Sequence, residues 1–417
     1  MYSVSTAASA LPLTKQLSSY PNDEVGQMAS VTPGSLCDTP VLCLAESRWQ
    51  SGIGGRHHLP REFSRRNDVC YVNPPVHVRD VFSVRADSGQ TQSQPTIIEF
   101  PPWLSRVYRP WLEKRLQRSR ISYLRRLLRK RWGKPPVILA FHPRIWPFVE
   151  ALPESPLFYF PFDAFGDYLY QGVARTATAY CDAQLAKRAK AIFTVTDSIA
   201  SSYSDQAAPV RVLPNGVDYS AFSAAWNEPD ELRAVPHPRL CMVGKLNSQL
   251  NYRLLLDVVN VVDASFVVVG AIQPMSDVET ELARRFLQHD RVFHVGAKPH
   301  SQVPAYVSNC DLGICPYSRN PVTLAGSSLK LMEYFAAGKP VVAVRLPSME
   351  SFKDMITFAE SADEWRQNIS VALKDDSSDK ISNRQRTAKR LSWQAQSELV
   401  GADIVAALQG CNLKWQA

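Results

Sequence analysis

The sequence predicts an α/β protein with two Rossmann-like domains, each built on a doubly wound parallel sheet, that face each other across a cleft. Short apolar runs typical of buried strands alternate with helical segments, and the alternation restarts as the same unit at residue 239. A chain of 417 residues with 45% hydrophobic residues is long enough to bury two such cores.

The first series of strands and helices predicts an N-terminal domain over residues 39–227. Its strands are expected at 40–44, 69–72, 137–141, 157–160, 191–195 and 210–213. A glycine-bearing loop, 51–55, follows the first strand, and a helix ends near Ala189. Residues 1–38 are rich in Ser, Thr, Ala and Pro without periodicity, which predicts a disordered extension, with Met28 as an alternative start.

The second series predicts a C-terminal domain over residues 239–375, reached through a Pro-bearing, charged linker, 228–238. Its strands are expected at 239–244, 265–270, 292–295, 312–315 and 341–344. A helical segment, 376–417, completes the chain. Because ligands of such sheets bind beyond the carboxyl ends of the strands, we expect the binding site in the cleft between the domains.

Composition argues against several classes of protein. No apolar run reaches 18 residues and the first thirty positions have no signal-peptide pattern, so the expected compartment is the cytoplasm. Eight cysteines are scattered without a C-x-x-C pair, which favours neither a zinc site nor a disulfide framework. Patterns of serine hydrolases, zinc metalloproteases and P-loop proteins are absent, and the glycines at 52–55 lack the further glycine and the acid of a dinucleotide site.

The segment 106–134 is strongly basic, with twelve Lys or Arg against the single acid Glu113. Tryptophan, tyrosine and leucine interleave with these charges. This composition is typical of an amphipathic helix on an anionic membrane surface, and the remainder of the chain is slightly acidic. Nucleic acid is the competing partner, although none is expected, and an ordinary solvated helix face is the third interpretation.

The stretch 325–342 reads as a loop, a helix and a strand. Gly326, Ser327 and Ser328 are expected to offer backbone N–H groups and a capping hydroxyl at the positive end of the helix, where a diphosphate can bind. Glu333 lies further along the helix and can accept hydrogen bonds from ribose hydroxyls. The same pattern also fits an ordinary capped helix of any α/β protein.

The run L-K-L-M-E-Y-F-A-A-G-K-P-V-V resembles the nucleotide-sugar segment of GT-B glycosyltransferases, specifically family 4 and its teichuronic-acid-biosynthesis branch. The segments R-H-H-L-P-R-E-F-S-R-R, L-P-N-G-V-D-Y-S-A-F and V-G-A-K-P-H-S-Q-V-P-A-Y agree with that branch in order. The resemblance covers nearly the whole chain from residue 40. It also implies that the C-terminal segment around Leu391-Ser392-Trp393 packs back across the cleft.

The resemblance implies retaining transfer of a sugar from a nucleotide-diphosphate donor to a glycan or lipid-linked acceptor in cell-envelope polysaccharide synthesis. It implies no bound metal and no cofactor other than the co-substrate, so that a helix N-terminus and basic side chains stabilise the leaving diphosphate. A peripheral position at the inner face of the plasma membrane follows for such an acceptor.

The same resemblance assigns roles to individual residues. Lys245, which follows Gly244 at the end of a strand, matches a loop that approaches the phosphates, and Lys330 is a second phosphate contact one turn before Glu333. Relatives often carry a second glutamate at the position of Ala325, so the contacts to the donor sugar differ here. His142 ends the strand 137–141 and is either a catalytic-side histidine or a structural one before proline.

Two other functions remain open from the sequence. A non-catalytic nucleotide-sugar-binding or scaffolding subunit of a glycan assembly complex is suggested by Ala325. A GT-B sugar-nucleotide epimerase would act on free nucleotide sugar without an acceptor.

Overall fold

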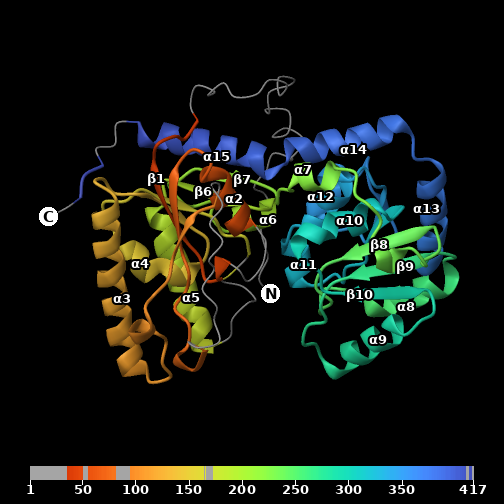
Figure 1. The fold of residues 1–417 in the computed structure, drawn as a ribbon, viewed down its shortest axis with the longest axis horizontal. Helices are drawn as coiled ribbons and strands as arrows, with labels where there is room; N and C mark the ends of the chain where they lie inside the picture. The colour runs from red at the N-terminus through yellow and green to blue at the C-terminus, as the bar shows by residue number, and fades with distance from the viewer. Residues whose placement is uncertain are drawn as a thin grey trace, which may run out of the picture.

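The computed structural model describes residues 35–49, 55–80, 94–163, 165, 172–409 and 413–415. Two α/β domains lie side by side, and the C-terminal helices run along one side of both (Figure 1). Most of the predicted extension, residues 1–34, and the glycine loop at 51–54 lie outside the described residues.

The N-terminal domain is built on a parallel sheet that has seven strands among the described residues, in the order β3-β2-β1-β4-β5-β6-β7. The strands are β1 (Pro40–Leu44), β2 (Asp68–Val72), β3 (Thr96–Ile98), β4 (Val137–Ala140), β5 (Leu157–Tyr159), β6 (Ala191–Thr194) and β7 (Val210–Val212). The α-helices are α2 (Gly55–Phe63), α3 (Pro110–Arg131), α4 (Trp146–Glu150), α5 (Gly172–Arg188), α6 (Asp197–Ser201) and α7 (Tyr219–Ser223). Because alternate strand residues join separate apolar clusters on the two faces, the sheet is buried on both sides.

The C-terminal domain repeats this plan with six parallel strands in the described part of the chain, ordered β10-β9-β8-β11-β12-β13. The strands are β8 (Arg239–Val243), β9 (Ser265–Val269), β10 (Val292–Gly296), β11 (Leu312–Cys315), β12 (Val341–Ala343) and β13 (Thr357–Phe358). The α-helices are α8 (Tyr252–Val261), α9 (Asp277–Leu287), α10 (Val303–Ser308), α11 (Pro321–Ala325), α12 (Leu329–Ala336) and α13 (Ala362–Lys374). The predicted fold class, two doubly wound parallel sheets, is confirmed.

Short 3-10 helices and two short strands complete the architecture. The 3-10 helices are η2 (Val78–Asp80), η3 (Pro102–Leu104), η4 (Pro143–Ile145), η5 (Asp230–Leu232), η6 (His300–Gln302) and η7 (Pro347–Phe352). The edge strands β3 and β13 were not predicted. Both are short and only partly buried at the edges of their sheets.

In each sheet the order of the strands reverses at one point. Ligands of doubly wound sheets bind at this switch point. In the N-terminal sheet the switch lies between β1 and β4, and in the C-terminal sheet it lies between β8 and β11. The residues directly after β8 are Gly244 and Lys245, and the first residues after β4 are Phe141 and His142. Three predicted site residues therefore follow strands at a switch point.

The last two helices, α14 (Ser378–Arg390) and α15 (Trp393–Leu408), link the domains. Helix α14 packs on α12 of the C-terminal domain and α15 packs on α2 of the N-terminal domain (Figure 1). Where they meet, the Trp393 amide donates to the carbonyl of Val217 at 3.0 Å, and Val217 N–H donates to Leu391 at 3.3 Å. Among the described residues, no helix has the length and apolar character that a bilayer crossing requires.

Candidate functional site

Two glycines let the loops after β8 and β9 cross in contact. A Cβ built on Gly270 would lie 1.7 Å from the carbonyl oxygen of Gly244, so no side chain fits there. Gly244 itself has φ +136°, a conformation that L side chains rarely adopt. His294 donates from Nε2 to the Gly270 carbonyl at 2.8 Å. The backbone at the switch point is therefore close-packed. Because Gly244 has no side chain, another group can lie against it.

That group is the side chain of Lys330, which comes from α12. Its Cε lies 3.5 Å from the position that a Cβ of Gly244 would take. Its Nζ donates to both oxygens of Glu333, at 3.1 and 3.2 Å. The Glu333 side chain is only 6% exposed and that of Lys330 is 23% exposed, so this ion pair is largely withdrawn from water. The structure thus brings together Gly244, Lys330 and Glu333, three of the predicted donor-binding residues.

Tyr334 holds α12 against β8. Its buried hydroxyl donates to the Cys241 carbonyl at 3.0 Å and accepts from the Val243 amide at 3.1 Å. Gly313 in β11 allows this approach, because a Cβ there would lie 2.4 Å from the Tyr334 ring. The position of Glu333, the preceding residue, is therefore set by hydrogen bonds to the end of the central strand.

The loop before α12 differs from the prediction in two details. Ser328 occupies the N-cap position, but its hydroxyl caps no backbone N–H and instead lies 3.1 Å from the hydroxyl of Tyr317. Tyr317 lies two residues after β11, and its hydroxyl takes the hydrogen bond of the serine in place of a backbone N–H. The N–H of Gly326 donates to the carbonyl of Val322 at the end of α11. It is therefore not available to a ligand, contrary to the prediction. The remaining amides at the start of α12 have no side-chain cap.

The N-terminal domain holds this loop in place. Thr196 donates from its hydroxyl to the Ala325 carbonyl at 2.8 Å, and Asn215 donates to the Ser327 carbonyl at 3.1 Å. Both contacts join residues that are more than a hundred positions apart in the sequence. The positions of Ala325 and Ser327 therefore depend on contacts with the other domain, which the sequence alone does not reveal.

An open pocket with about 630 Å³ of empty space lies at this junction. Thr196, Asp197 and Asn215 line it from the N-terminal domain, and Ser327 and Ser328 line it from the C-terminal domain. Burial raises the pKa of the Asp197 carboxyl. Polar groups of both domains therefore meet at this pocket, alongside apolar side chains that include Leu324, Met332 and Phe352.

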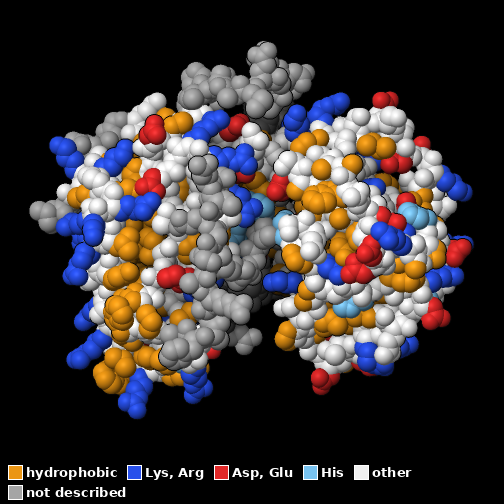
Figure 2. Space-filling model, viewed as in Figure 1, with side chains coloured by type: hydrophobic (Ala, Val, Ile, Leu, Met, Phe, Trp, Pro, Cys, Tyr) orange, Lys and Arg blue, Asp and Glu red, His pale blue; other side chains and the backbone are white. Residues whose placement is uncertain are grey.

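A cluster of aromatic rings joins the domains beside the Lys330–Glu333 pair. His58 in α2 stacks on Trp393 with ring centroids 5.1 Å apart and an interplanar angle of 7°. The ring of His300, in η6, lies 5.9 Å from that of His58. Histidine side chains are visible between the two domains in Figure 2. Burial lowers the pKa of His58 to about 3, and it also lowers the pKa of His300, although nearby Glu333 opposes that shift.

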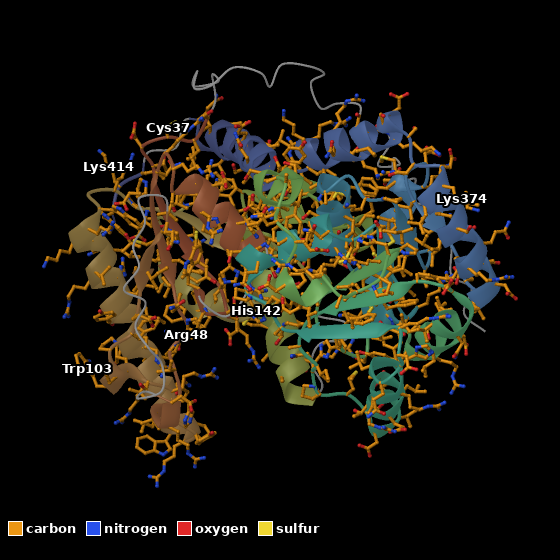
Figure 3. The ribbon with its side chains drawn as sticks, turned by 45° about the vertical axis from the view of Figure 1, so that its right-hand side comes forward. Cys37, Arg48, Trp103, His142, Lys374 and Lys414 are labelled. Atoms are coloured by element: carbon orange, nitrogen blue, oxygen red, sulfur yellow. The ribbon has the colours of Figure 1, made fainter. Side chains whose placement is uncertain are left out.

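Two further predicted site residues are Lys245 and His142. The side chain of Lys245 is exposed. His142 belongs to the N-terminal domain, where its Nδ1 accepts from the Arg144 amide at 3.1 Å and begins η4 (Figure 3). Burial lowers the pKa of His142 to about 4, with Arg144 acting in the same direction. The histidine is neutral near pH 7 and caps a turn, which fits the structural interpretation, and the catalytic-side role stays a prediction.

Sequence reasoning missed several residues of the site. Thr196, Asn215 and Tyr317 contact the 325–328 loop, and His300 lies near Glu333. Glu46, just after β1, faces Arg144 at 3.7 Å, and burial raises the pKa of its carboxyl. The position of Glu46 and Tyr317 after strands that flank a switch point was a usable signal, and Asn215 lies in the segment L-P-N-G-V-D-Y-S-A-F that carries the resemblance. Thr196 had no such signal. No group of three metal-ligating side chains occurs within the part of the chain that the structure describes.

Comparisons with known proteins agree with this geometry. Residues 237–375 match the family model described as glycosyl transferases group 1. The putative teichuronic acid biosynthesis glycosyltransferase TuaH of Bacillus subtilis (strain 168) is 33% identical over 144 residues. That match covers 33% of this chain and 35% of the relative, so it spans little more than a third of the relative's length.

Solved structures share the whole architecture at low identity. Anabaena Alr3699/HepE, solved in complex with UDP and glucose, has a TM-score of 0.62 and 14% identity, covering 88% of this chain and 100% of that one. Sucrose-phosphate synthase from Thermosynechococcus elongatus has a TM-score of 0.66 and 15% identity, covering 90% and 100%. Residues 237–375 of this chain are thus a glycosyl transferases group 1 domain, and the chain has the two-domain GT-B fold.

Proposed function

We propose that the protein is a glycosyltransferase that moves a sugar from a nucleotide-diphosphate donor to a glycan or lipid-linked acceptor in polysaccharide synthesis. The observation that carries the proposal is the largely buried Lys330–Glu333 pair, which lies beside Gly244 at the switch point of the C-terminal sheet. The group 1 family match over residues 237–375 and the similarity to TuaH support the same reaction class.

The donor fits this site by charge and by hydrogen bonding. Glu333, which is paired with Lys330, accepts hydrogen bonds from the ribose hydroxyls. The Lys330 ammonium group attracts the diphosphate. The amides at the start of α12, which lack a side-chain cap, add donors at the positive end of the helix. Lys245 is exposed one residue beyond Gly244 and supplies a second cation. HepE was solved with UDP-glucose, which supports a nucleotide sugar as the donor.

Bond cleavage leaves negative charge on the departing nucleoside diphosphate. Lys330, Lys245 and the helix amides stabilise that charge in a partly desolvated site, where each interaction is stronger than in water. The expectation of a metal-independent, retaining transfer rests on the resemblance to family 4 and is tested by product stereochemistry and by activity in excess chelator.

The acceptor enters from the side of the N-terminal domain. Asp197 and Thr196 line the pocket that faces Ser327 and Ser328, and they offer hydrogen-bonding groups to a sugar hydroxyl. A lipid-linked acceptor at the inner face of the plasma membrane is consistent with the basic helix α3 on the same domain.

The first experiment is a thermal-shift panel with UDP, GDP, ADP and TDP and their common sugars, followed by product analysis with acceptor lipids and glycans. A ligand at 100 times its dissociation constant adds about 2.7 kcal/mol of stability. A shift for one nucleotide together with sugar transfer supports the proposal. Binding without transfer or hydrolysis favours the scaffolding alternative, and conversion of the free nucleotide sugar favours an epimerase.

A further inference from the structure

Three large aromatic side chains are exposed in η3, at the start of α3 and in the segment that joins them. Trp103 is 75% exposed, Tyr108 is 72% exposed and Trp111 is 59% exposed, and we call these three residues the aromatic tip. Trp103 lies near the lower end of the N-terminal domain in Figure 3. A soluble surface rarely gathers tryptophan and tyrosine at one place without a partner, because each ring exposes a large apolar area to water.

Basic side chains surround the aromatic tip. The guanidinium carbon of Arg79 lies 5.0 Å from the centroid of Tyr108, and that of Arg115 lies 5.9 Å from the centroid of Trp111. Further exposed cations in the same segment are Arg106, Arg109, Lys114 and Arg118. In Figure 2, hydrophobic side chains at the lower left are bordered by Lys and Arg.

The acid within this segment is already neutralised. Glu113 accepts from the guanidinium of Arg120 at 2.6 Å and from the Val107 amide at 3.0 Å, which lowers the pKa of its carboxyl. Arg120 is fully buried beneath the helix, where it also donates to the carbonyls of Leu104 and Ser105. This network fixes η3 to α3 and holds the aromatic tip as a rigid unit.

The C-terminal half of α3 is used differently. Arg125 pairs with Glu154 at 3.2 Å, and Arg131 pairs with Asp68 at 2.7 Å. Leu124 and Leu128 are buried in the core of the domain. This half of the basic segment therefore docks the helix on its own domain. Arg126 and Lys130 stay exposed there, whereas the exposed rings of the aromatic tip lie at the other end.

We propose that the aromatic tip docks on an anionic lipid bilayer, with the rings in the interfacial layer and the surrounding cations on the lipid phosphates. Tryptophan and tyrosine favour that layer because they combine an apolar body with a polar edge. Charge complementarity selects anionic lipid, since each basic residue near such a surface contributes roughly 1 kcal/mol. The inference rests on the proposed function in that a membrane-bound acceptor requires the enzyme at the bilayer.

Vesicle sedimentation tests the proposal with the full-length chain. The vesicles are phosphatidylcholine alone and phosphatidylcholine with phosphatidylglycerol. W103S/W111S is expected to weaken binding to the anionic vesicles at least ten-fold, because both rings are exposed and support no core. R106Q/R109Q/R118Q is expected to weaken it about a hundred-fold, from about 1 kcal/mol for each of three charges.

The matched control is R126Q/K130Q/K134Q, which removes the same charge from exposed positions at the other end of the helix. A 22-residue helix is about 33 Å long. This exceeds the Debye length of about 8 Å at physiological ionic strength, so the control is expected to bind almost as the wild type does. Equal losses in the two triple variants, or wild-type binding by W103S/W111S, overturns the proposal.

Oligonucleotide binding, measured by fluorescence anisotropy, tests nucleic acid as the competing partner. A wild-type chain that ignores vesicles but binds single-stranded RNA through Trp103 and Trp111 overturns the membrane assignment. Turnover with a water-soluble acceptor analogue and no vesicles is expected to be unchanged in every tip variant. A chain that binds vesicles through the tip but transfers no sugar refutes the proposed function and leaves the docking surface intact.

Discussion

The hydroxyl of Thr196 in the N-terminal domain donates a hydrogen bond of 2.8 Å to the carbonyl of Ala325 in the C-terminal domain, 129 residues away. The same oxygen accepts from the Ile199 amide at 3.3 Å and so caps α6. One side chain thus begins a helix in one domain and fixes the loop before α12 in the other. At Ala325, the backbone carbonyl is the group that makes the contact.

Thr196→Val is expected to raise the donor KM several-fold, because it removes the hydrogen bond to Ala325 and lets the 325–328 loop move. Loss of the cap on α6 adds about 1 kcal/mol of destabilisation. Steady-state kinetics and urea unfolding measure the two effects. Thr196→Ser keeps the hydroxyl and is expected to behave as the wild type in both, so a serine variant as impaired as the valine variant contradicts the role of the hydroxyl.

Glu333→Gln is expected to lower kcat/KM at least ten-fold. The glutamine amide has one acceptor oxygen in place of two and carries no charge, so the charge of Lys330 is left uncompensated. The comparison is Glu281→Gln, which removes the acid of an exposed pair with Arg284 on α9. That control is expected to keep wild-type kinetics. Unaltered turnover in Glu333→Gln removes this residue from the donor site.

Gly270→Ala is expected to destabilise the protein by about 1–3 kcal/mol or more, because its Cβ would lie 1.7 Å from the Gly244 carbonyl oxygen and the loops would have to separate. The same displacement is expected to weaken nucleotide binding. Gly133→Ala provides the control, since a Cβ there has no neighbour within 4 Å. Equal stabilities of the two variants in urea unfolding contradict the close crossing of the loops.

Trp393→Ala is expected to cost about 3–5 kcal/mol of unfolding free energy. The ring is 3% exposed and stacks on His58, and Cβ atoms added at Gly55 and Gly216 would lie 3.0 and 2.7 Å from it. Trp226, which is 39% exposed, is the matched control. A cost for Trp393→Ala no larger than for Trp226→Ala contradicts its function as the anchor of α15.

Acid sensitivity follows from the lowered pKa of His58, which is about 3 in the folded chain against an ordinary value of 6.5. The unfolded chain binds the proton first, so this histidine contributes a loss of stability that begins as the pH falls below 6.5 and ends near pH 3. Between pH 7 and pH 5 the loss is about 2 kcal/mol for one such group. His58→Gln is expected to lack that part of the pH dependence, as measured by urea unfolding at both pH values.

Much of the architecture was readable from local patterns. The central strands β1, β4 and β9 are apolar runs between loop residues, and burial on both faces makes each run continuous. The proximity of Lys330 and Glu333 could also be predicted from the sequence, because residues three apart in a helix lie on the same side. The capping function of Ser328 was wrong, since a nearby tyrosine hydroxyl from another loop competes for it.

Local patterns in the sequence specify the alternation of strands and helices, the restart of that alternation at residue 239, and the position of Glu333 on a helix after a glycine-bearing loop. Tertiary contacts show in addition that Thr196 and Asn215 hold this loop, that Trp393 packs against His58 in α2, and that Arg125 and Arg131 pair with acids while the other end of α3 stays exposed. The reason is that periodicity and spacing report contacts within a few residues, whereas these contacts depend on strand order and on how the two sheets are placed, which bring together side chains from distant parts of the chain.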